Sequence, residues 1–342
     1  MKRTLCIVAC SLCALLIFSC VNNTWVETPE NLIQKYSIEH YEFSKEKVDS
    51  LEQKLSVELL RDTLAKEVIP IINELLIQYK SHSPKKALSL TPHIHALYRS
   101  YPDSSELPYS FQLIGHVFQE LGLYEKAKNH YFVGHDLSDR IRDFKYRNFI
   151  SLNIGDVYFN QGYYKVALDH YMDSFTGFKE WELNSGLAYC SMKIALTYMK
   201  LERLGNAEEY VKKAIQYSAT KQFSFPKRVA IKSLEAALLM KTNQQEKAAI
   251  LIEALEKSAQ GSNRLELGNL YKLLGDISTE NKDTLAGTDY YQKSYKIFTQ
   301  LPYPKKRVQL QLKIAEYASS FQNTPKQALG TLKEALQLVE EE

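Results

Sequence analysis

Apolar residues recur three and four positions apart through residues 108–339, which predicts a long series of amphipathic helices. Within this series, an apolar residue often stands directly before a Gly or Ala in one helical stretch. Twelve residues after that Gly or Ala, a second helical stretch has another small residue. Two units are nearly superimposable, namely Ile114-Gly115, Phe118, Gly122, Ala127 and Tyr131, and Ile154-Gly155, Tyr158, Gly162, Ala167 and Tyr171. Small residues suit the places where two helices cross closely, so each unit is predicted to be an antiparallel helix pair.

The small residue of the first helix recurs every 39 to 41 residues, at Gly115, Gly155, Ala195, Ala236, Gly275 and Ala315. Gly122 and Gly162 fall between the two helical patterns, where a turn favours a residue that tolerates positive φ. A single pair cannot bury its own apolar face. The pairs are therefore expected to stack on one another as a solenoid.

The segment Leu113-Ile114-Gly115 with Ala127, and the segment Asn153-Ile154-Gly155-Asp156-Val157-Tyr158 with Ala167, resemble the tetratricopeptide repeat family. This resemblance implies an all-α fold, a right-handed α-α superhelical solenoid of helix pairs that binds a protein or peptide without catalysis. The interval here exceeds the period of about 34 residues usual in that family, which adds roughly one and a half helical turns to each unit. A HEAT-type array is the alternative at this interval, but the Gly/Ala and Tyr spacing fits it poorly.

Residues 31–107 keep a helical apolar spacing without the repeat signature, which predicts a helical cap with degenerate repeats. Pro70 is expected to start or kink a helix, and residues 102–108 to connect the cap to the clear repeats. The predicted organisation is a signal peptide at 1–19, a tether at 20–30, the cap at 31–107 and the solenoid at 108–342.

The first twenty residues have the features of an export signal. Lys2 and Arg3 precede an uncharged, mostly apolar stretch that ends at Phe18, and Ser19 precedes Cys20. The run Leu15-Leu16-Ile17-Phe18-Ser19-Cys20 resembles the lipobox of bacterial lipoproteins, although Phe18 departs from the small residue preferred there. The resemblance implies that Cys20 carries acyl chains and anchors the protein to the outer membrane, facing the periplasm. An ordinary secretory leader is the alternative.

Charge and cysteine content exclude several classes of function. The net charge is +3, and loss of Lys2 and Arg3 with the leader lowers it by two to +1, so nucleic acid is not an expected partner. Beyond residue 20 the only cysteine is Cys190, which predicts a small buried hydrophobic residue rather than a disulfide or metal ligand.

The sequence contains no recognisable catalytic or cofactor motif, so we expect no enzyme activity, cofactor or metal site. His93 and His95 are two residues apart and face different sides of a helix, which favours packing over metal binding.

The resemblance also implies that the first helix of each pair lines a concave binding face. Candidate partner-binding residues on it are Gln112, His116, Gln119, Asp156, Asn160, Met192 and Met199. The basic and asparagine residues with which some relatives clamp a terminal carboxylate are not reproduced. We therefore expect a partner held by mixed polar and apolar contacts, the alternative being a merely solvated face.

A second candidate surface is a basic rim at the junctions between pairs, formed by Arg142, Arg147, Lys227, Arg228, Lys305, Lys306 and Arg307. Prolines at positions 226 and 304 place several of these cations in first helical turns, where the helix dipole disfavours them by a few tenths of a kcal/mol each. The pattern predicts contact with an acidic partner, lipid head groups or lipopolysaccharide phosphates. Neutralisation by nearby carboxylates is the alternative.

These observations favour a lipid-anchored envelope scaffold that binds a protein or peptide. Two alternatives remain open: a periplasmic ligand sensor acting with a separate signalling partner, and a nutrient-binding lipoprotein of an outer-membrane transporter.

Overall fold

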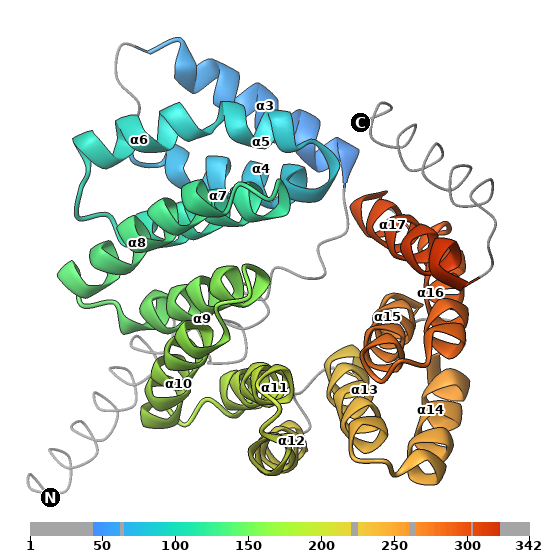
Figure 1. Cartoon of the computed structure of the whole chain (residues 1–342). Coiled ribbons are helices and arrows are strands. Elements are labelled where there is room, and N and C mark those ends of the chain that lie inside the picture. The colour runs from blue at the N-terminus through green and yellow to red at the C-terminus, as the bar shows by residue number, and fades with distance from the viewer. Residues whose placement is uncertain (1–43, 62–64, 220–224, 260–263, 302–303, 322–342) are drawn as a thin grey trace, which may run out of the picture. The chain divides into compact units, whose positions relative to one another are not determined.

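A computed structural model describes residues 44–61, 65–219, 225–259, 264–301 and 304–321. The regular secondary structure of these residues is α-helical (Figure 1). The chain divides into two compact units at residue 39. Residues 1–39, which include the predicted signal peptide, Cys20 and the tether, lie outside the described residues, as do residues 322–342.

The unit that begins at residue 40 contains all the described helices. Their bounds are α3 Lys45–Leu59, α4 Val68–His82, α5 Pro84–Ser89, α6 Thr91–Ser100, α7 Leu107–Glu120, α8 Tyr124–Arg140, α9 Phe144–Asn160, α10 Tyr164–Glu180, α11 Asn184–Lys200, α12 Leu204–Ser218, α13 Phe225–Lys241, α14 Gln245–Ala259, α15 Arg264–Glu280, α16 Thr284–Phe298 and α17 Pro304–Phe321.

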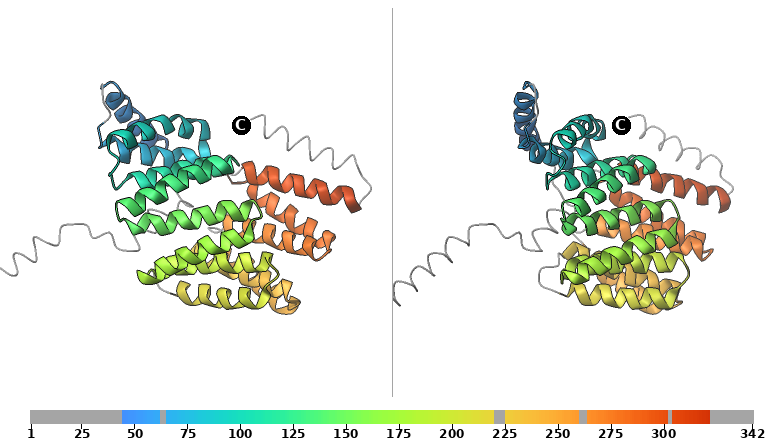
Figure 2. Two further views of the ribbon diagram at one scale, coloured as in Figure 1. Left: turned by 60° about the vertical axis from the view of Figure 1, so that its left-hand side comes forward. Right: turned by 90° about the vertical axis from the view of Figure 1, so that its left-hand side faces the viewer.

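Helices that are neighbours in sequence pack against one another from α7 to α17. The first helices of successive pairs, such as α7 and α9 or α13 and α15, also contact each other, so the pairs stack in sequence order (Figure 2). This arrangement confirms the predicted all-α solenoid of helix pairs. In the predicted cap, Pro70 is the third residue of α4 and so lies in its first turn, where proline needs no hydrogen-bond partner for its nitrogen.

Within a pair, the crossing is made by a glycine in the first helix and a tyrosine ring from the second. The Tyr131, Tyr171 and Tyr291 side chains are fully buried. A Cβ atom added to Gly115, Gly155 or Gly275 would lie only 2.3, 2.6 or 2.6 Å from the ring of the corresponding tyrosine. Glycine is therefore required at these crossings because the ring occupies the space of a side chain.

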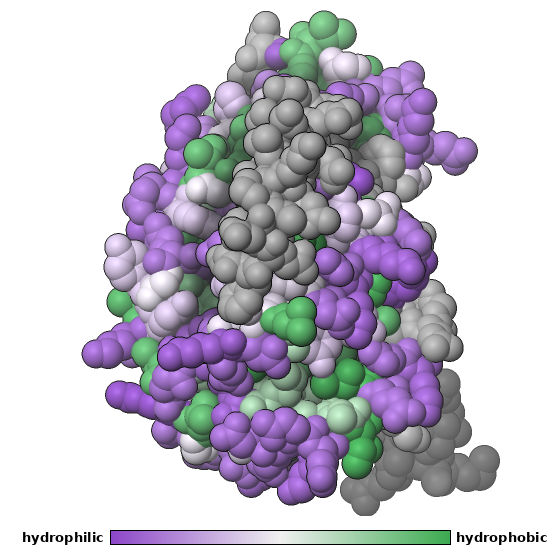
Figure 3. Space-filling view, turned by 45° about the vertical axis from the view of Figure 1, so that its right-hand side comes forward, coloured by the Kyte–Doolittle hydropathy of each residue, from purple (hydrophilic) through white to green (hydrophobic). Residues whose placement is uncertain are grey.

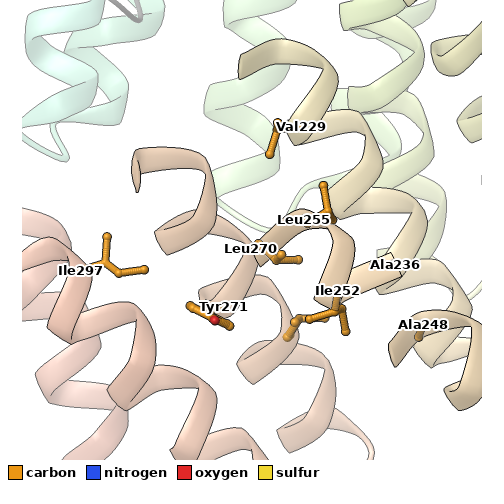
Figure 4. Close-up of a cluster of buried hydrophobic side chains, with 9 residues drawn as sticks. Val229, Ala236, Ala248, Ile252, Leu255, Leu270, Tyr271 and Ile297 are labelled. Carbon is orange, nitrogen blue, oxygen red and sulfur yellow. The ribbon is translucent and has the colours of Figure 1, made fainter. Parts of the chain in front are cut away.

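The middle pairs fill the same space with aliphatic residues. Ala195 and Ala236 replace the glycine, and Val211 and Ile252 stand in the places of the tyrosine. One cluster of buried side chains starts in the second of these pairs and joins four helices, α13 to α16 (Figure 4). This cluster includes Val229, Leu255, Leu270, Tyr271 and Ile297, so apolar packing continues from one pair to the next.

From α7 to α16, each described turn from a first to a second helix contains a residue with positive φ. Gly122 and Gly162 have φ of 73° and 82°, as their positions predicted. The equivalent residues of the next three pairs are Glu202, Asn243 and Lys282, with φ of 56°, 57° and 66°. In each turn, the residue after this one donates its backbone N–H to a carbonyl five residues earlier at 2.9 Å, which is a Schellman-type helix end. The backbone geometry therefore recurs even where glycine does not.

We expect Gly155→Ala to destabilise the protein, because the new methyl group overlaps the buried Tyr171 ring. Overpacking of this kind costs about 1–3 kcal/mol. Gly205→Ala is the matched control, since a Cβ atom there has no neighbour within 4 Å, and it should cause no loss. Urea unfolding followed by circular dichroism measures both; equal midpoints for the two variants would contradict this account of the crossing.

Candidate functional site

We define the first-helix face by three positions in the first helix of each pair. The second position lies four residues after the first, and the third lies three residues after the second. In α7 these positions are Gln112, His116 and Gln119; in α9, Leu152, Asp156 and Phe159; and in α11, Met192, Leu196 and Met199. This face includes the predicted partner-binding residues except Asn160, which is exposed one position further along α9.

The predicted residues differ in how much surface they present. Gln112 and Met199 are buried, with 1% and 2% of their surface exposed. Met192 is half-buried and packs against a small cluster formed by Ala188, Ala214 and Ile231. The side chains of Gln112 and Met199 therefore belong to the interior, whereas Met192 keeps part of its surface at the face.

Asp156 lies at the centre of a polar link between two successive pairs. Its carboxylate accepts a hydrogen bond from the Tyr171 hydroxyl at 2.5 Å and pairs with the Lys193 ammonium at 2.9 Å. Because these three residues belong to α9, α10 and α11, the link joins both helices of one pair to the first helix of the next.

The same link recurs in the last described pair. The Asp276 carboxylate accepts a hydrogen bond from Tyr291 at 2.8 Å and pairs with Lys313 at 2.9 Å, and Lys272 pairs with it at 2.8 Å. Sequence reasoning missed this motif. In the sequence, the motif is an aspartate with a tyrosine 15 residues after it and a lysine 37 residues after it. The second copy, at Asp276, begins 120 residues after the first, at Asp156.

The second copy of the link is electrostatically strong. Burial raises the pKa of Asp276, but the adjacent Lys272 and Lys313 ammonium groups outweigh that effect and hold the pKa below its ordinary value of 3.8. Burial lowers the pKa of Lys313, and the Asp276 carboxylate more than compensates, so its net pKa is raised. Both groups therefore stay ionised at neutral pH and stabilise the junction between α15, α16 and α17.

The first pair lacks this link although it keeps the tyrosine. His116 stands in place of the aspartate and Asn153 in place of the lysine, so the Tyr131 hydroxyl donates instead to Gln119 at 2.8 Å. Among the buried polar atoms that have no hydrogen-bond partner within the described part of the chain, three belong to α7 and α9: Gln112 Oε1, His116 Nε2 and Asn153 Nδ2. An unsatisfied buried group costs about 1–3 kcal/mol, so these atoms form a polar site that packing alone does not explain.

Electrostatics at this polar site favour a neutral imidazole. Burial, together with the positive charges of Lys80 and Lys193, lowers the pKa of His116 to about 3. At neutral pH His116 is therefore uncharged, and each of its ring nitrogens either donates or accepts a hydrogen bond according to tautomer.

A Ser-His-Asp cluster in the second pair has the residue types of a catalytic triad but not its geometry. The buried Ser151 hydroxyl donates to Asp173 at 3.0 Å, while His170 Nδ1 lies 3.5 Å from it. In a triad the histidine accepts the serine proton and the aspartate orients the histidine. Here the aspartate takes the serine hydrogen bond directly, which makes the cluster a packing contact between α9 and α10.

Apart from Arg142, which precedes α9, the basic residues at the junctions lie at the starts of α9, α13 and α17. Arg147 is neutralised by Asp139 at 3.0 Å and Asp173 at 3.4 Å. Lys306 donates to Asn269 and lies over the Phe298 ring, whereas Arg142 is exposed in a turn with φ of 56°. Lys227, Arg228 and Arg307 are half-buried, and the Lys305 side chain lies outside the described residues.

Exposed apolar side chains, helix length and the single described cysteine bear on three further kinds of site: an apolar docking patch, a membrane span and a reactive thiol. The most exposed large apolar side chains, Leu60, Leu285 and Ile250, belong to separate parts of the chain, and on the face in Figure 3 apolar patches lie between hydrophilic residues. No described helix has both the length and the apolar character needed to span a membrane. Cys190 is a fully buried free thiol whose pKa is raised by burial, which confirms the prediction of a small buried hydrophobic residue.

Comparison with known proteins identifies the repeat. Residues 188–221, which span α11 and α12, match the sequence model of a family described as tetratricopeptide repeat. Residues 188–221 are therefore similar to one tetratricopeptide repeat. A search of curated proteins finds no match to this sequence.

Solved structures share the fold of the whole helical array. The apo form of RapI has a TM-score of 0.61 at 12% identity, over 80% of this chain and 99% of that chain. Aspartyl phosphate phosphatase F from Bacillus subtilis has a TM-score of 0.59 at 17% identity, over 69% of this chain and 61% of that chain. A Rap protein complexed with competence and sporulation factor has a TM-score of 0.52 at 15% identity, over 81% and 78%. These similarities establish a tetratricopeptide-like helical-repeat fold.

Lys313→Met should remove one lysine from Asp276 and destabilise the protein at neutral pH by about 1 kcal/mol, a value reduced by the partial exposure of the pair. Because the pKa of Asp276 is lowered in the folded protein, the ion pair contributes stability above pH 3.8 and loses it as pH falls through the folded pKa. The difference from the unsubstituted protein should therefore shrink in acid.

Urea unfolding at pH 7 and at several values below pH 4 measures this difference. Lys257→Met is the control, because Lys257 forms an exposed pair with Glu253 within α14. Its effect should stay below about 0.5 kcal/mol at each pH. A pH-independent loss in Lys313→Met would show that its packing, not its charge, stabilises the junction.

Proposed function

We propose that this protein is a non-catalytic scaffold that binds a peptide segment of a protein partner on the first-helix face and is held at the cell envelope by a lipid on Cys20. The observation that carries the binding proposal is the set of unpaired polar atoms in the first and second pairs, Gln112 Oε1, His116 Nε2 and Asn153 Nδ2. These atoms are buried in the ligand-free fold, so a peptide reaches them once neighbouring side chains of the first-helix face move aside. A peptide that then supplies their hydrogen bonds recovers the free energy that the folded protein alone forgoes.

The chemistry of these atoms suits a peptide main chain. Gln112 Oε1 accepts a hydrogen bond, Asn153 Nδ2 donates one, and neutral His116 does either. An extended peptide presents alternating N–H and C=O groups that meet such a mixture. Half-buried Phe159, Met192 and Leu196 continue the face with apolar surface for peptide side chains.

A protein of similar fold supports the same use of a helical array. The Rap protein described above forms a complex with competence and sporulation factor. The similarity of fold makes a ligand-binding helical array a reasonable template, while the residues named above provide the argument specific to this chain.

The envelope address rests on the amino-terminal sequence. Cys20 follows Ser19 at the end of an uncharged, mostly apolar stretch, and no aspartate follows it directly. Two or more acyl chains on one residue hold a protein at a bilayer far more firmly than a single chain. We place the protein at the outer membrane, facing the periplasm.

The peptide-binding proposal is tested by Gln112→Met and Asn153→Leu, which keep side-chain volume and remove the unpaired groups. We expect partner capture to fall about tenfold or more, while stability to urea stays the same or rises, because an apolar side chain has no unmet hydrogen bond. The partner is identified by crosslinking in intact cells, purification from separated membranes and mass spectrometry.

Asn129→Leu is the matched control, since Asn129 is exposed on α8 and the chemical change is the same. It should leave capture unchanged. Recovery of the same partner by all three variants would exclude the first-helix face. Recovery of no specific protein by the unsubstituted chain would favour a small ligand, as in a sensor or nutrient-binding lipoprotein.

Cys20→Ala should abolish incorporation of a labelled fatty acid and release the protein from the membrane fraction. The physical reason is that the acyl chains supply the apolar surface that partitions into the bilayer. Metabolic labelling with an alkyne fatty acid, followed by fractionation, measures both effects. Cys190→Ala is the control, and label that persists in Cys20→Ala would refute the lipoprotein assignment.

A further inference from the structure

Two histidines from different helices meet at the junction between the predicted cap and the first repeat. His95 belongs to α6 and His130 to α8, and their Nε2 atoms are 3.4 Å apart. The ring centroids are 5.5 Å apart and the ring planes make an angle of 69°. The outer nitrogens of the two imidazoles are therefore adjacent.

The hydrogen bonding of His130 defines which of its nitrogens has a lone pair. Its Nδ1 lies 2.7 Å from the carbonyl oxygen of Lys126, one turn earlier in α8. A carbonyl only accepts, so Nδ1 carries the proton and Nε2 faces His95 with a free lone pair. A hydrogen bond of this kind, from the second ring nitrogen to a backbone carbonyl, fixes the tautomer of histidines that bind metals.

The separation of the two Nε2 atoms matches that of two ligands on one tetrahedral metal ion. Zinc–nitrogen bonds of about 2.0–2.1 Å at a tetrahedral angle place two nitrogens about 3.3–3.4 Å apart. We infer that His95 and His130 bind a divalent transition-metal ion such as Zn²⁺ through their Nε2 atoms, with water or a partner's side chain completing the coordination. This inference is independent of the proposed peptide site.

The surroundings hold the two rings in place. The His95 ring packs edge-on against Phe111 at 5.4 Å, and the His130 ring lies against Phe118 at 4.9 Å. Both histidines are half-buried, so an ion from solvent reaches them without opening the helical core. Rigid side chains lose little conformational freedom on binding, which favours a site made of only two protein ligands.

Local charge acts in two directions. Burial lowers the pKa of both histidines; Arg99 lowers that of His95 further, and Lys126 lowers that of His130 while its carbonyl raises it. Imidazole binds a metal ion in its neutral form, which a lowered pKa favours. The same cations repel a metal ion, and Lys126 is held over the Phe118 ring beside the site. A site of moderate affinity follows from these opposing effects.

Sequence spacing alone concealed this pair. His93 and His95 are two residues apart in the sequence, but the residue that contacts His95 is His130, 35 residues later in α8. Within the described residues, no group of three or more His, Cys, Asp or Glu side chains is arranged to hold a metal ion. The coordination therefore rests on two protein ligands.

Binding is tested by titrating the untagged full-length protein in detergent with Zn²⁺ and with Co²⁺ at pH 7.5, after its accessible thiols have been alkylated. Calorimetry should give one site per chain, and Co²⁺ should develop the visible absorption bands of a tetrahedral complex. His95→Ala and His130→Gln should each weaken binding by about tenfold or more, as loss of a ligand requires.

His93→Ala is the matched control and should retain full affinity. Circular dichroism confirms that each variant has the helical content of the unsubstituted protein, and His95→Gln serves if His95→Ala fails to fold. Absence of Zn²⁺ and Co²⁺ binding by the unsubstituted protein, or binding that survives in both His95→Ala and His130→Gln, would overturn the inference. The His95–His130 contact would then be a simple hydrogen bond between the cap and the first repeat.

Discussion

The close crossing of two helices at a glycine is the constraint on which this array is built. Gly115, Gly155 and Gly275 leave room for a buried tyrosine ring from the second helix, and the ring fills the space between the helices. Since the contacts of a solenoid are mainly between neighbouring repeats, each crossing must be satisfied largely within its own pair. Alanine with valine or isoleucine meets the same requirement in the middle pairs with less aromatic surface.

The buried tyrosine also brings a polar group to the first-helix face. Its hydroxyl needs an acceptor, and an aspartate on the first helix provides one in the second and last described pairs. A buried carboxylate in turn needs a cation, which comes from a lysine of the next first helix. Burial of the tyrosine ring at the helix crossing thus leads to a hydrogen bond within the pair and then to an ion pair between repeats.

The first pair departs from this chain of requirements. It keeps Tyr131 but has His116 where the aspartate stands elsewhere, and Asn153 of the next first helix takes the place of the lysine. Buried polar atoms are left there without partners among the described residues. Local rules are usually broken where function requires it, because an unsatisfied group costs stability. The difference between otherwise equivalent repeats therefore marks the binding candidate more clearly than the shared features do.

The sequence by itself determined the helix pairs, their interval and their small-residue crossings, because the positions of Gly, Ala and Tyr are set by neighbours close in the chain. It also anticipated the burial of Cys190 and the positive φ of Gly122 and Gly162. It did not anticipate positive φ at Glu202, Asn243 and Lys282, since the turn geometry is imposed there by the two helices it connects. Only the tertiary structure decided that Asp156 meets Lys193, that Arg147 is neutralised by two carboxylates, and that His95 meets His130. Those contacts join residues on different helices, and their geometry depends on how successive pairs stack, which no spacing within one helix specifies.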